Sequence, residues 1–283
     1  MPYIIASSKD MASLTIKRQL LTHFEFNTTE IEFDGYIVYR FKDTDVLLIT
    51  SDRDLINTNH IEKKFKTDLF IFASRHKSKS GVPALLAHTP GNLGNDASLG
   101  GNPREIAVSA PMALKLALIE LMRQKIILSL NDFDVSLEAT HHGPTDLNTP
   151  IIFVELGSDE THWNNKLGAL AVARSIMRIA LEYKHSEKNA IGFGGGHYVS
   201  KFNDIVYSTD IAIGHMAAKY VLDQLDEDMV RKMVERTDSK IDFAIIDWKG
   251  CSGKQRRHLI DIFEAIGLPY YKGKQILKNA KVF

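Results

Sequence analysis

The chain has 283 residues, of which 44% are hydrophobic and 25% are charged, a composition typical of a globular protein with a sizeable core. Its 35 basic and 35 acidic residues give no net charge, which excludes a polycation that gathers nucleic acid through bulk charge. The single cysteine, Cys251, excludes an internal disulfide and a cysteine-rich zinc site.

Hydropathy argues against secretion and membrane insertion. Only a short apolar run, residues 3–6, precedes the first charges, which is unlike a secretory signal. No window holds the roughly 20 apolar residues that a membrane-spanning helix needs. We therefore expect a cytoplasmic protein.

Apolar runs and helical repeats alternate along the chain. The expected strands are 3–6, 36–41, 45–50, 69–73, 135–139, 151–156, 190–193, 205–208 and 243–247, and 36–41 forms a hairpin with 45–50. The expected helices are 11–22, 61–65, 112–125, 161–183, 216–225, 227–235 and 253–266. This alternation predicts an α/β fold with a mainly parallel or mixed central sheet and helices on both faces. We expect one compact domain over residues 1–283, with a division into two lobes as the alternative.

A long irregular segment, 88–104, separates two of these elements and is rich in glycine and asparagine. Loops of this length in a compact domain are usually functional or disordered. The segment is therefore expected to border a binding site.

Polar residues gather where strands are expected to end, and open parallel sheets bind ligands at the carboxyl ends of their strands. The first such cluster follows 69–73 and contains Arg75, His76, Lys77 and Lys79. We expect it to bind a phosphate or a terminal ribose. The alternative is a polar turn, which is less favoured because neighbouring cations repel one another.

A second cluster follows 135–139 and contains Glu138, His141 and His142. A carboxylate with two neutral imidazoles suits a zinc site or a general-base pair. Because adjacent histidines normally point in different directions, we do not expect both on one metal.

Two further residues are candidates for a metal site. Glu155 follows the apolar run 151–154, and a carboxylate buried there needs a partner or a metal. His215 is expected to open a helix, whose N-terminus keeps an imidazole neutral, and a structural role for it is equally favoured. The predicted metal ligands are His88, His142, Glu155 and His215.

Three successive glycines, Gly194, Gly195 and Gly196, precede His197. The segment fails the dinucleotide-binding fingerprint, because His197 stands where the last glycine is required. Glycine still allows backbone N–H groups to approach an anion, such as an oxyanion or a phosphate. His197 is a candidate general base.

The C-terminal part of the chain is basic, with eight basic and two acidic residues from Lys249 onward, Lys281 being the last of the eight. This asymmetry predicts a phosphate-binding face that includes Lys254, Arg256 and Arg257, although a solvated surface is an equal alternative. The segment 250–255 resembles half of a P-loop but lacks its first glycine and its Ser/Thr, so we exclude a nucleoside triphosphate site. We expect Cys251 to be unreactive.

Six strings stand in the order SRHKSKSG, LLAHTPGN, EATHHGP, VELGS, GFGGGHY and IGHM. Together they resemble the D-aminoacyl-tRNA deacylase of archaea, a family with plant members, and the resemblance covers essentially the whole chain. It implies hydrolysis of the ester between a D-amino acid and the 3′-terminal ribose of tRNA, two zinc ions per subunit, a monomer, and a fold similar to nucleoside phosphorylases and bacterial peptidyl-tRNA hydrolases. The resemblance brings no ligand set, so the site residues rest on the pattern of this chain.

We therefore predict a hydrolase that releases D-amino acids from tRNA, with His141, His142, His197 and Glu138 as catalytic residues and no nucleotide cofactor. One alternative is a peptidyl-tRNA hydrolase or a related metal-dependent hydrolase. Another is a non-catalytic RNA-binding protein, which should carry a net basic surface with exposed aromatic residues. The zero net charge and the histidines at strand ends favour an enzyme.

Overall fold

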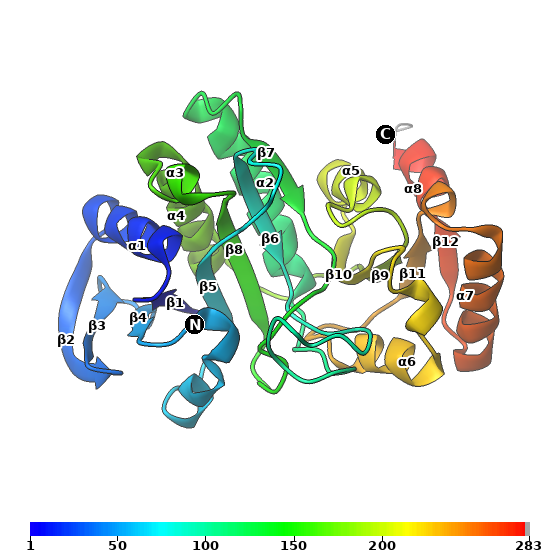
Figure 1. The fold of residues 1–283 in the computed structure, drawn as a ribbon, viewed down its shortest axis with the longest axis horizontal. Coiled ribbons are helices and arrows are strands. Elements are labelled where there is room, and N and C mark those ends of the chain that lie inside the picture. The colour runs from blue at the N-terminus through cyan, green and yellow to red at the C-terminus, as the bar shows by residue number, and fades with distance from the viewer. Residues whose placement is uncertain (281–283) are drawn as a thin grey trace. The chain divides into compact units, whose positions relative to one another are not determined.

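The computed structural model describes residues 1–280 and divides the chain into two compact units (Figure 1). The first unit comprises Met1–Ala87, Leu116–Val135 and Ile151–Tyr183. The second comprises His88–Lys115, Ser136–Pro150 and the chain from Lys184 onward. Each unit therefore draws on segments that are far apart in the sequence.

A large mixed sheet has the strand order β2-β3-β4-β1-β5-β8-β6-β7. Its strands are β1 (Tyr3–Ser7), β2 (Phe26–Phe33), β3 (Tyr36–Phe41), β4 (Leu47–Ser51), β5 (Phe70–Arg75), β6 (Ala84–His88), β7 (Asp134–Leu137) and β8 (Ile151–Gly157). The neighbours β4, β1, β5 and β8 are parallel, whereas β2, β3 and β4 form an antiparallel meander. The central strands are almost continuously apolar, as expected for parallel strands covered on both faces.

The helices that accompany this sheet are α1 (Met11–His23), α2 (Pro111–Ile127), α3 (Glu160–Trp163) and α4 (Lys166–Glu182), with short 3₁₀ turns η1 (Leu55–Asn57) and η2 (Asn59–Lys63). The predicted helix 161–183 is divided in two because polar caps interrupt it. Asp159 accepts a hydrogen bond from the His162 amide at the start of α3. Asn165 accepts one from the Gly168 amide at the start of α4.

A smaller, fully parallel sheet lies in the second unit, with the order β10-β9-β11-β12. Its strands are β9 (Asn189–Phe193), β10 (Ala212–Ala217), β11 (Phe243–Ile246) and β12 (Tyr270–Lys272). The accompanying helices are α5 (Ser200–Ser208), α6 (Glu227–Glu235), α7 (Gly253–Ile266) and α8 (Gly273–Ala280), with 3₁₀ turns η3 (Leu222–Gln224) and η4 (Trp248–Gly250).

The alternation of side chains along β9 shows why helices cover both faces of the smaller sheet. Ile191 and Phe193 join an apolar core that includes Met229 of α6 and Leu259 of α7. Gly192 points to the opposite face, where a Cβ atom would lie 2.9 Å from the Phe202 ring of α5. The strand is thus packed between two helical layers.

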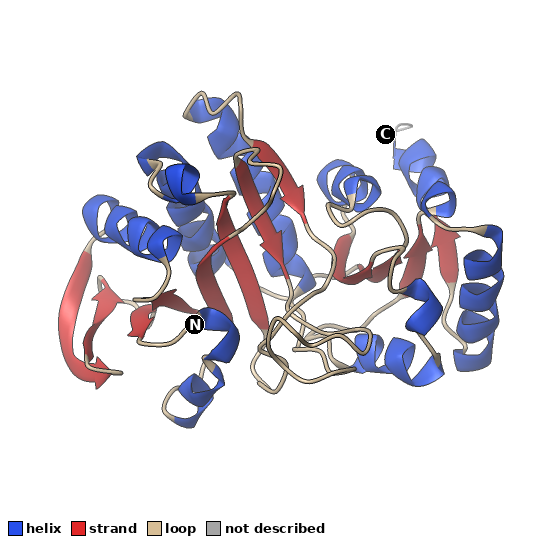
Figure 2. Cartoon of the chain, in the orientation of Figure 1, coloured by secondary structure: helices blue, strands red, loops and turns tan. Residues whose placement is uncertain are grey.

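The predicted α/β class is confirmed, and Figure 2 shows the alternation of strands and helices on which it rests. The hairpin of 36–41 with 45–50 is also confirmed, as β3 and β4. Two element predictions are wrong: 205–208 belongs to helix α5, and the start of 216–225 belongs to strand β10. No helix within residues 1–280 combines the length and apolarity needed to span a membrane.

Candidate active site

The parallel strands of the smaller sheet bring their carboxyl ends to one edge. Beyond this edge follow the glycine segment and His197 from β9, Tyr220 from β10 and Trp248 from β11. The segment after β7 joins them through backbone hydrogen bonds. The Ala139 amide donates to the His197 carbonyl, and the Thr140 amide donates to the Met216 carbonyl, both at 2.8 Å.

The irregular segment 88–104 packs against the histidine pair. The Gly91 amide donates to the carbonyls of His141 and His142 at 3.1 and 2.7 Å. A Cβ atom on Gly91 would lie 2.7 Å from Ile106 and 2.8 Å from Thr140, so this close approach requires glycine. The loop and the histidines together border a cavity of about 360 Å³, lined by Gly91, Asn92, Leu93, Gly94, Asp96, Ser98, Leu99, Thr140, His141, His142, His197, Tyr220, Val221 and Gln224.

Three histidines form the first cluster at this cavity. The His88 ring centroid lies 4.1 Å from that of His141 and 4.7 Å from that of His142. One ring nitrogen from each of the three lies within 4.8 Å of the others. Our expectation that His141 and His142 point apart is wrong. His142 has a left-handed backbone with φ of 47°, and its ring centroid is 4.5 Å from that of His141.

Backbone carbonyls define which nitrogen of each adjacent histidine carries the lone pair. His141 Nδ1 lies 2.8 Å from the Ala139 carbonyl, and His142 Nδ1 lies 2.6 Å from the Gly143 carbonyl. Since a carbonyl only accepts, Nδ1 of both neutral rings is the N–H donor and Nε2 is the lone-pair nitrogen. This is the arrangement that commonly orients histidine ligands of metals.

A second group surrounds His197. Its Nε2 lies 2.9 Å from Oε1 of Glu138, and its Nδ1 lies 3.2 Å from the Tyr220 hydroxyl. Glu138 is fully buried, whereas Tyr220 is 63% exposed and turns its hydroxyl toward the cavity. Desolvation, followed by the negative charge of Glu138, raises the pKa of Tyr220, so the phenol stays protonated and can donate to Nδ1.

The two groups meet at His141. Its ring centroid lies 4.7 Å from that of His197, and Glu138, His141 and His197 also place ligand atoms within 4.8 Å of one another. The structure therefore brings the four residues predicted to be catalytic close to one another. The cavity can accommodate a cation held by imidazoles next to a carboxylate-oriented histidine, which are the parts that ester hydrolysis uses.

His215 does not belong to this cavity, so its prediction as a metal ligand needs correction. It lies in strand β10 rather than at a helix start, and it is fully buried. Its Nε2 bonds the Arg236 carbonyl at 3.0 Å, and its Nδ1 lies 3.3 Å from the Thr140 hydroxyl. Burial lowers the pKa of His215 to about 4, so it is a neutral core residue.

The glycine segment also has a different role from the predicted one. The Gly194 amide donates to the Ala217 carbonyl at 2.8 Å, and the Gly195 amide donates to the Gly250 carbonyl at 3.2 Å. These two N–H groups are therefore not directed at a ligand. Gly194 has φ of 104°, and a Cβ atom there would lie 2.5 Å from Cys251 Sγ. Backbone conformation and close packing explain the glycine. Gly196, the third predicted glycine, is exposed and has open space around its Cβ position.

The cluster after β5 lies in the first unit together with Glu155. His76 is buried, and its Nδ1 is 3.7 Å from Oε2 of Glu155. Arg75 contacts Asp54 at 3.4 Å and lies over the Trp163 ring, whereas Lys77 and Lys79 are exposed. Glu155 is thus beside His76 in the first unit, while His88, His142 and the cavity belong to the second.

The predicted basic face begins at helix α7. Lys254 and Arg257 are exposed, whereas Arg256 is half-buried, and Lys281 lies outside the described residues. The Ser252 hydroxyl accepts a hydrogen bond from the Gln255 backbone amide, and the Gln255 side chain accepts one from the Ser252 backbone amide. These two bonds form a capping box at the start of α7. Burial, followed by the charge of Asp247, raises the pKa of Cys251 to about 11, which disfavours the reactive thiolate form.

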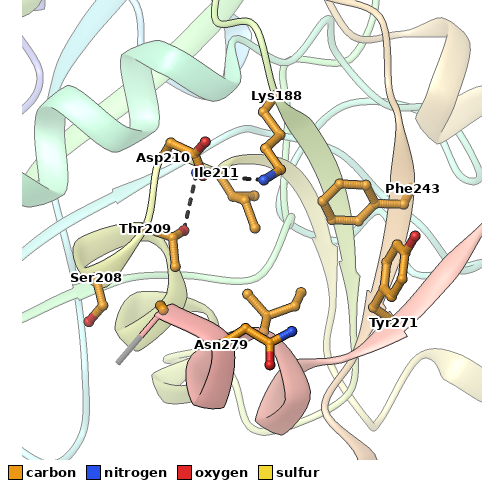
Figure 3. Close-up of a pocket in the computed structure, with 10 residues that line it drawn as sticks. Lys188, Ser208, Thr209, Asp210, Ile211, Phe243, Tyr271 and Asn279 are labelled. Atoms are coloured by element: carbon orange, nitrogen blue, oxygen red, sulfur yellow. Dashed lines mark hydrogen bonds and ion pairs between the residues drawn. The ribbon is translucent and has the colours of Figure 1, made fainter. Parts of the chain in front are cut away.

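A larger cavity, of about 540 Å³, lies at the amino ends of the same strands (Figure 3). Its walls include Phe243 and Tyr271, whose rings meet edge to face at 5.2 Å, and Lys188 pairs there with Asp210 at 3.5 Å. It contains no histidine among its lining residues. The larger of the two cavities is therefore not the one lined by histidines.

Sequence reasoning missed Tyr220, because it lay inside a wrongly predicted helix. It also missed Gln224, whose side chain accepts a hydrogen bond from the Asn95 amide and closes one wall of the cavity. The available signal was the polar stretch that follows the six residues Ala212–Ala217, and that run is too short to separate strand from helix.

An α/β protein with a histidine- and carboxylate-lined cavity at the carboxyl edge of a parallel sheet has the features of a hydrolase. A family model for D-aminoacyl-tRNA deacylase matches residues 63–271. D-aminoacyl-tRNA deacylases of Thermococcus kodakarensis and Methanosarcina acetivorans are 36% and 38% identical to it. Each match covers 96% of this chain, and 100% and 92% of the respective relative. The chain belongs to the D-aminoacyl-tRNA deacylase family.

The fold is also that of a solved protein. A crystal structure described as a conserved protein of unknown function superposes with a TM-score of 0.89 at 28% identity. The match covers 98% of this chain and 97% of the other. The whole chain, and not just the segment matched by the family model, therefore shares one known architecture.

Proposed function

We propose that this chain hydrolyses the ester bond of D-aminoacyl-tRNA in the cavity bordered by His141, His142 and His197. The observation that carries the proposal is the convergence of these histidines with His88 and Glu138, in a chain that belongs to the D-aminoacyl-tRNA deacylase family. The reaction releases a free D-amino acid and tRNA. It needs an activated water and a stabiliser for the tetrahedral oxyanion.

His197 is proposed to accept the proton of the attacking water. Its Nδ1 faces the cavity where the Tyr220 hydroxyl now lies at 3.2 Å, so a water or ribose hydroxyl can take the same position. Glu138 holds Nε2–H at 2.9 Å, which fixes the ring and stabilises the imidazolium that forms. Tyr220 remains protonated and can donate a hydrogen bond to an oxyanion or to the leaving ribose oxygen.

His88, His141 and His142 are proposed to hold a zinc ion. Their fit rests on three neighbouring imidazoles, two of which have Nδ1 engaged by carbonyls and Nε2 as the lone-pair nitrogen. Zinc bound there would supply Lewis-acid stabilisation of the ester oxygen and a more acidic water. Glu138, His141 and His197 form an overlapping donor group, so the second zinc implied by the resemblance is a prediction for metal analysis.

Basic residues outside the cavity are proposed to hold the tRNA. We propose that Lys254, Arg256 and Arg257, and on the first unit Arg75, Lys77 and Lys79, contact tRNA phosphates. A cytoplasmic monomer is proposed because the family is named for a tRNA substrate and each cluster lies within one chain. Gel filtration coupled to light scattering measures the oligomeric state.

The decisive experiment compares three substrates on the metal-free and zinc-restored protein. D-Tyr-tRNA, L-Tyr-tRNA and N-acetylated D-Tyr-tRNA are incubated separately, and released amino acid is measured. We expect hydrolysis of D-Tyr-tRNA at least about a hundredfold faster than of the other two, with activity lost on chelation and regained with zinc. Equal rates on both enantiomers would refute the deacylase, and preference for the N-acetylated substrate would indicate a peptidyl-tRNA hydrolase.

A further inference from the structure

Two cations lie over the same indole ring at the carboxyl edge of the smaller sheet. The Arg256 guanidinium carbon is 4.9 Å from the centroid of Trp248, and the Lys272 ammonium is 3.9 Å from it. Trp248 directly follows β11 in the turn η4, and Lys272 ends β12. Three elements therefore meet at one half-buried aromatic side chain.

The chain holds this arrangement in place. Arg256 donates from both Nε and Nη2 to the Cys251 carbonyl, at 3.2 and 2.8 Å, which fixes the plane of the guanidinium. Neither Arg256 nor Lys272 forms an ion pair with a carboxylate of residues 1–280. A π face attracts a cation without neutralising it. The two positive charges repel each other, so an anionic ligand would stabilise the arrangement.

The cation pair is connected to the catalytic cavity. The Gly195 amide, two residues before His197, donates to the Gly250 carbonyl in the turn that carries Trp248. The Gln255 amide group donates to the Lys219 carbonyl at 3.2 Å, next to Tyr220. The cations and the cavity therefore lie on the same edge of the same sheet.

Two carboxylates near the ring offset part of this positive charge. The Asp223 carboxylate accepts from Gln255 at 2.8 Å, and the Asp247 carboxylate lies against Gly195 and Gly250. The exposed residues next to Trp248 and Arg256 in the sequence include further cations, namely Lys249, Lys254 and Arg257. The local field thus favours an anionic ligand even though the net charge of the protein is zero.

We propose that Trp248, Arg256 and Lys272 form a clamp for a backbone phosphate of the tRNA acceptor strand. The guanidinium presents a planar fork of donors, the ammonium adds a point charge, and the indole ring holds both in register. This inference rests on the proposed deacylase function and names the part of the substrate that binds beside the cavity. Lys272 belongs to the basic C-terminal stretch that the sequence predicts to face phosphates, whereas Trp248 was not predicted from the sequence as a tRNA contact.

The principal test removes both charges while keeping polar side chains. In Arg256→Gln/Lys272→Gln, tRNA affinity should fall about tenfold, the scale of losing hydrogen bonds to a charged group. The slope of log affinity against log salt should flatten by roughly 1 to 2 units. Lys188→Gln/Lys240→Gln, which removes two exposed cations beside the amino ends of the same sheet, is the charge-matched control. Filter binding across a salt series measures all three proteins.

A second variant separates the clamp from bulk charge. Trp248→Leu retains both cations but removes the ring that positions them, so affinity should fall while the salt slope stays near that of the wild type. Thermal unfolding of each variant verifies folding. The clamp is overturned if Arg256→Gln/Lys272→Gln binds tRNA with the wild-type affinity and slope, or matches the control variant.

A phosphate-free substrate distinguishes failure of the clamp from failure of the function. For each protein, kcat/KM is measured with 3′-O-D-tyrosyl-adenosine and with D-Tyr-tRNA. In the clamp variant, kcat/KM for D-Tyr-tRNA should fall about tenfold relative to kcat/KM for 3′-O-D-tyrosyl-adenosine, when compared with the wild type. If the wild type hydrolyses neither ester, the deacylase function fails, while filter binding still judges the clamp. If inorganic phosphate stabilises the wild type but not the clamp variant, and tRNA affinity is unchanged, the occupant is free phosphate and the tRNA contact is overturned.

Discussion

The two ends of the smaller sheet each carry a cavity, and only one of the two is lined by histidines. The amino-end cavity is larger, at about 540 Å³ against about 360 Å³, and its lining mixes apolar and polar residues, including the exposed pair Lys188 and Asp210, but has no histidine. The carboxyl-end cavity brings together imidazoles and the fully buried Glu138. Parallel strands make this difference systematic, because chain turns at their carboxyl ends can converge on a ligand.

The largest expected effect is at His141, which both donor groups share. His141→Ala should lower the turnover of D-Tyr-tRNA by at least about a hundredfold, the scale of losing a base or ligand. Its Tm should fall by no more than about 4 °C, since the change removes one hydrogen bond to Ala139. Asn279→Ala, at the amino-end cavity, is the control. Wild-type turnover in His141→Ala would show that the carboxyl-end cluster is structural.

His142→Ala tests whether the left-handed residue belongs to the same unit. It should lose turnover on the same scale as His141→Ala and should also lose bound zinc. Metal content after dialysis measures the second effect independently of activity. Full zinc retention in His142→Ala would remove it from the proposed ligand set.

An intermediate effect is expected at Glu138, which accepts a hydrogen bond from His197 Nε2. Glu138→Gln retains the shape of the side chain but removes the charge that stabilises an imidazolium. Turnover should fall about ten- to hundredfold, as for carboxylates that orient a functional histidine. Single-turnover rates at saturating D-Tyr-tRNA measure this step. A change in KM alone would instead assign Glu138 to substrate binding.

How far the sequence could predict this site depends on which contacts are local. Runs such as 69–73 and 151–156 identified strands of the larger sheet, and the polar residues that follow 190–193 identified the edge of the smaller sheet at which the cavity lies. Glu138 and His197 are 59 positions apart in the sequence. The sequence could therefore predict only that both follow strands, and not that they contact each other. The convergence of His141 with His142 depends on a positive φ at His142. L-residues rarely adopt this backbone conformation, and it could not be predicted from the sequence.

The element errors have the same origin. Phe202, Ile205 and Val206 form the buried side of helix α5, but the four residues 205–208 alone match a strand equally well. Strand β10 is buried along its whole length, so it shows no alternation to distinguish it from a helix. His215 was consequently placed at a helix start, and its burial could not be foreseen.

His215 lies within β10 and is a histidine of the core, unlike the histidines that line the cavity. Its folded-state pKa of about 4 is below the ordinary 6.5, so the unfolded chain binds more protons between these values. Its contribution to stability is therefore present above pH 6.5 and is lost as pH falls toward 4. At about 1.4 kcal/mol per pH unit, the loss amounts to about 3 kcal/mol.

Urea unfolding between pH 7 and pH 4.5 measures that contribution. His215→Gln cannot titrate, so its free energy of unfolding should be lower than the wild type at pH 7 but should depend less on pH in this window. The difference between the two proteins cancels the carboxylates that titrate in both. Parallel pH profiles would mean that His215 is not the buried neutral group that sets this dependence.

The smallest effects are expected from substitutions at the amino-end cavity. Lys188 and Asp210 are 49% and 73% exposed, so water and salt screen their attraction, and Asp210→Asn should change the free energy of unfolding by less than about 1 kcal/mol. Tyr271 is 49% exposed and has no contact with the histidine cluster, so Tyr271→Ala should leave kcat and KM for D-Tyr-tRNA near their wild-type values. Steady-state kinetics and urea unfolding of both variants measure these quantities. A tenfold loss of kcat in Tyr271→Ala would show that the two ends are coupled through the sheet, because only four residues of β11 separate them.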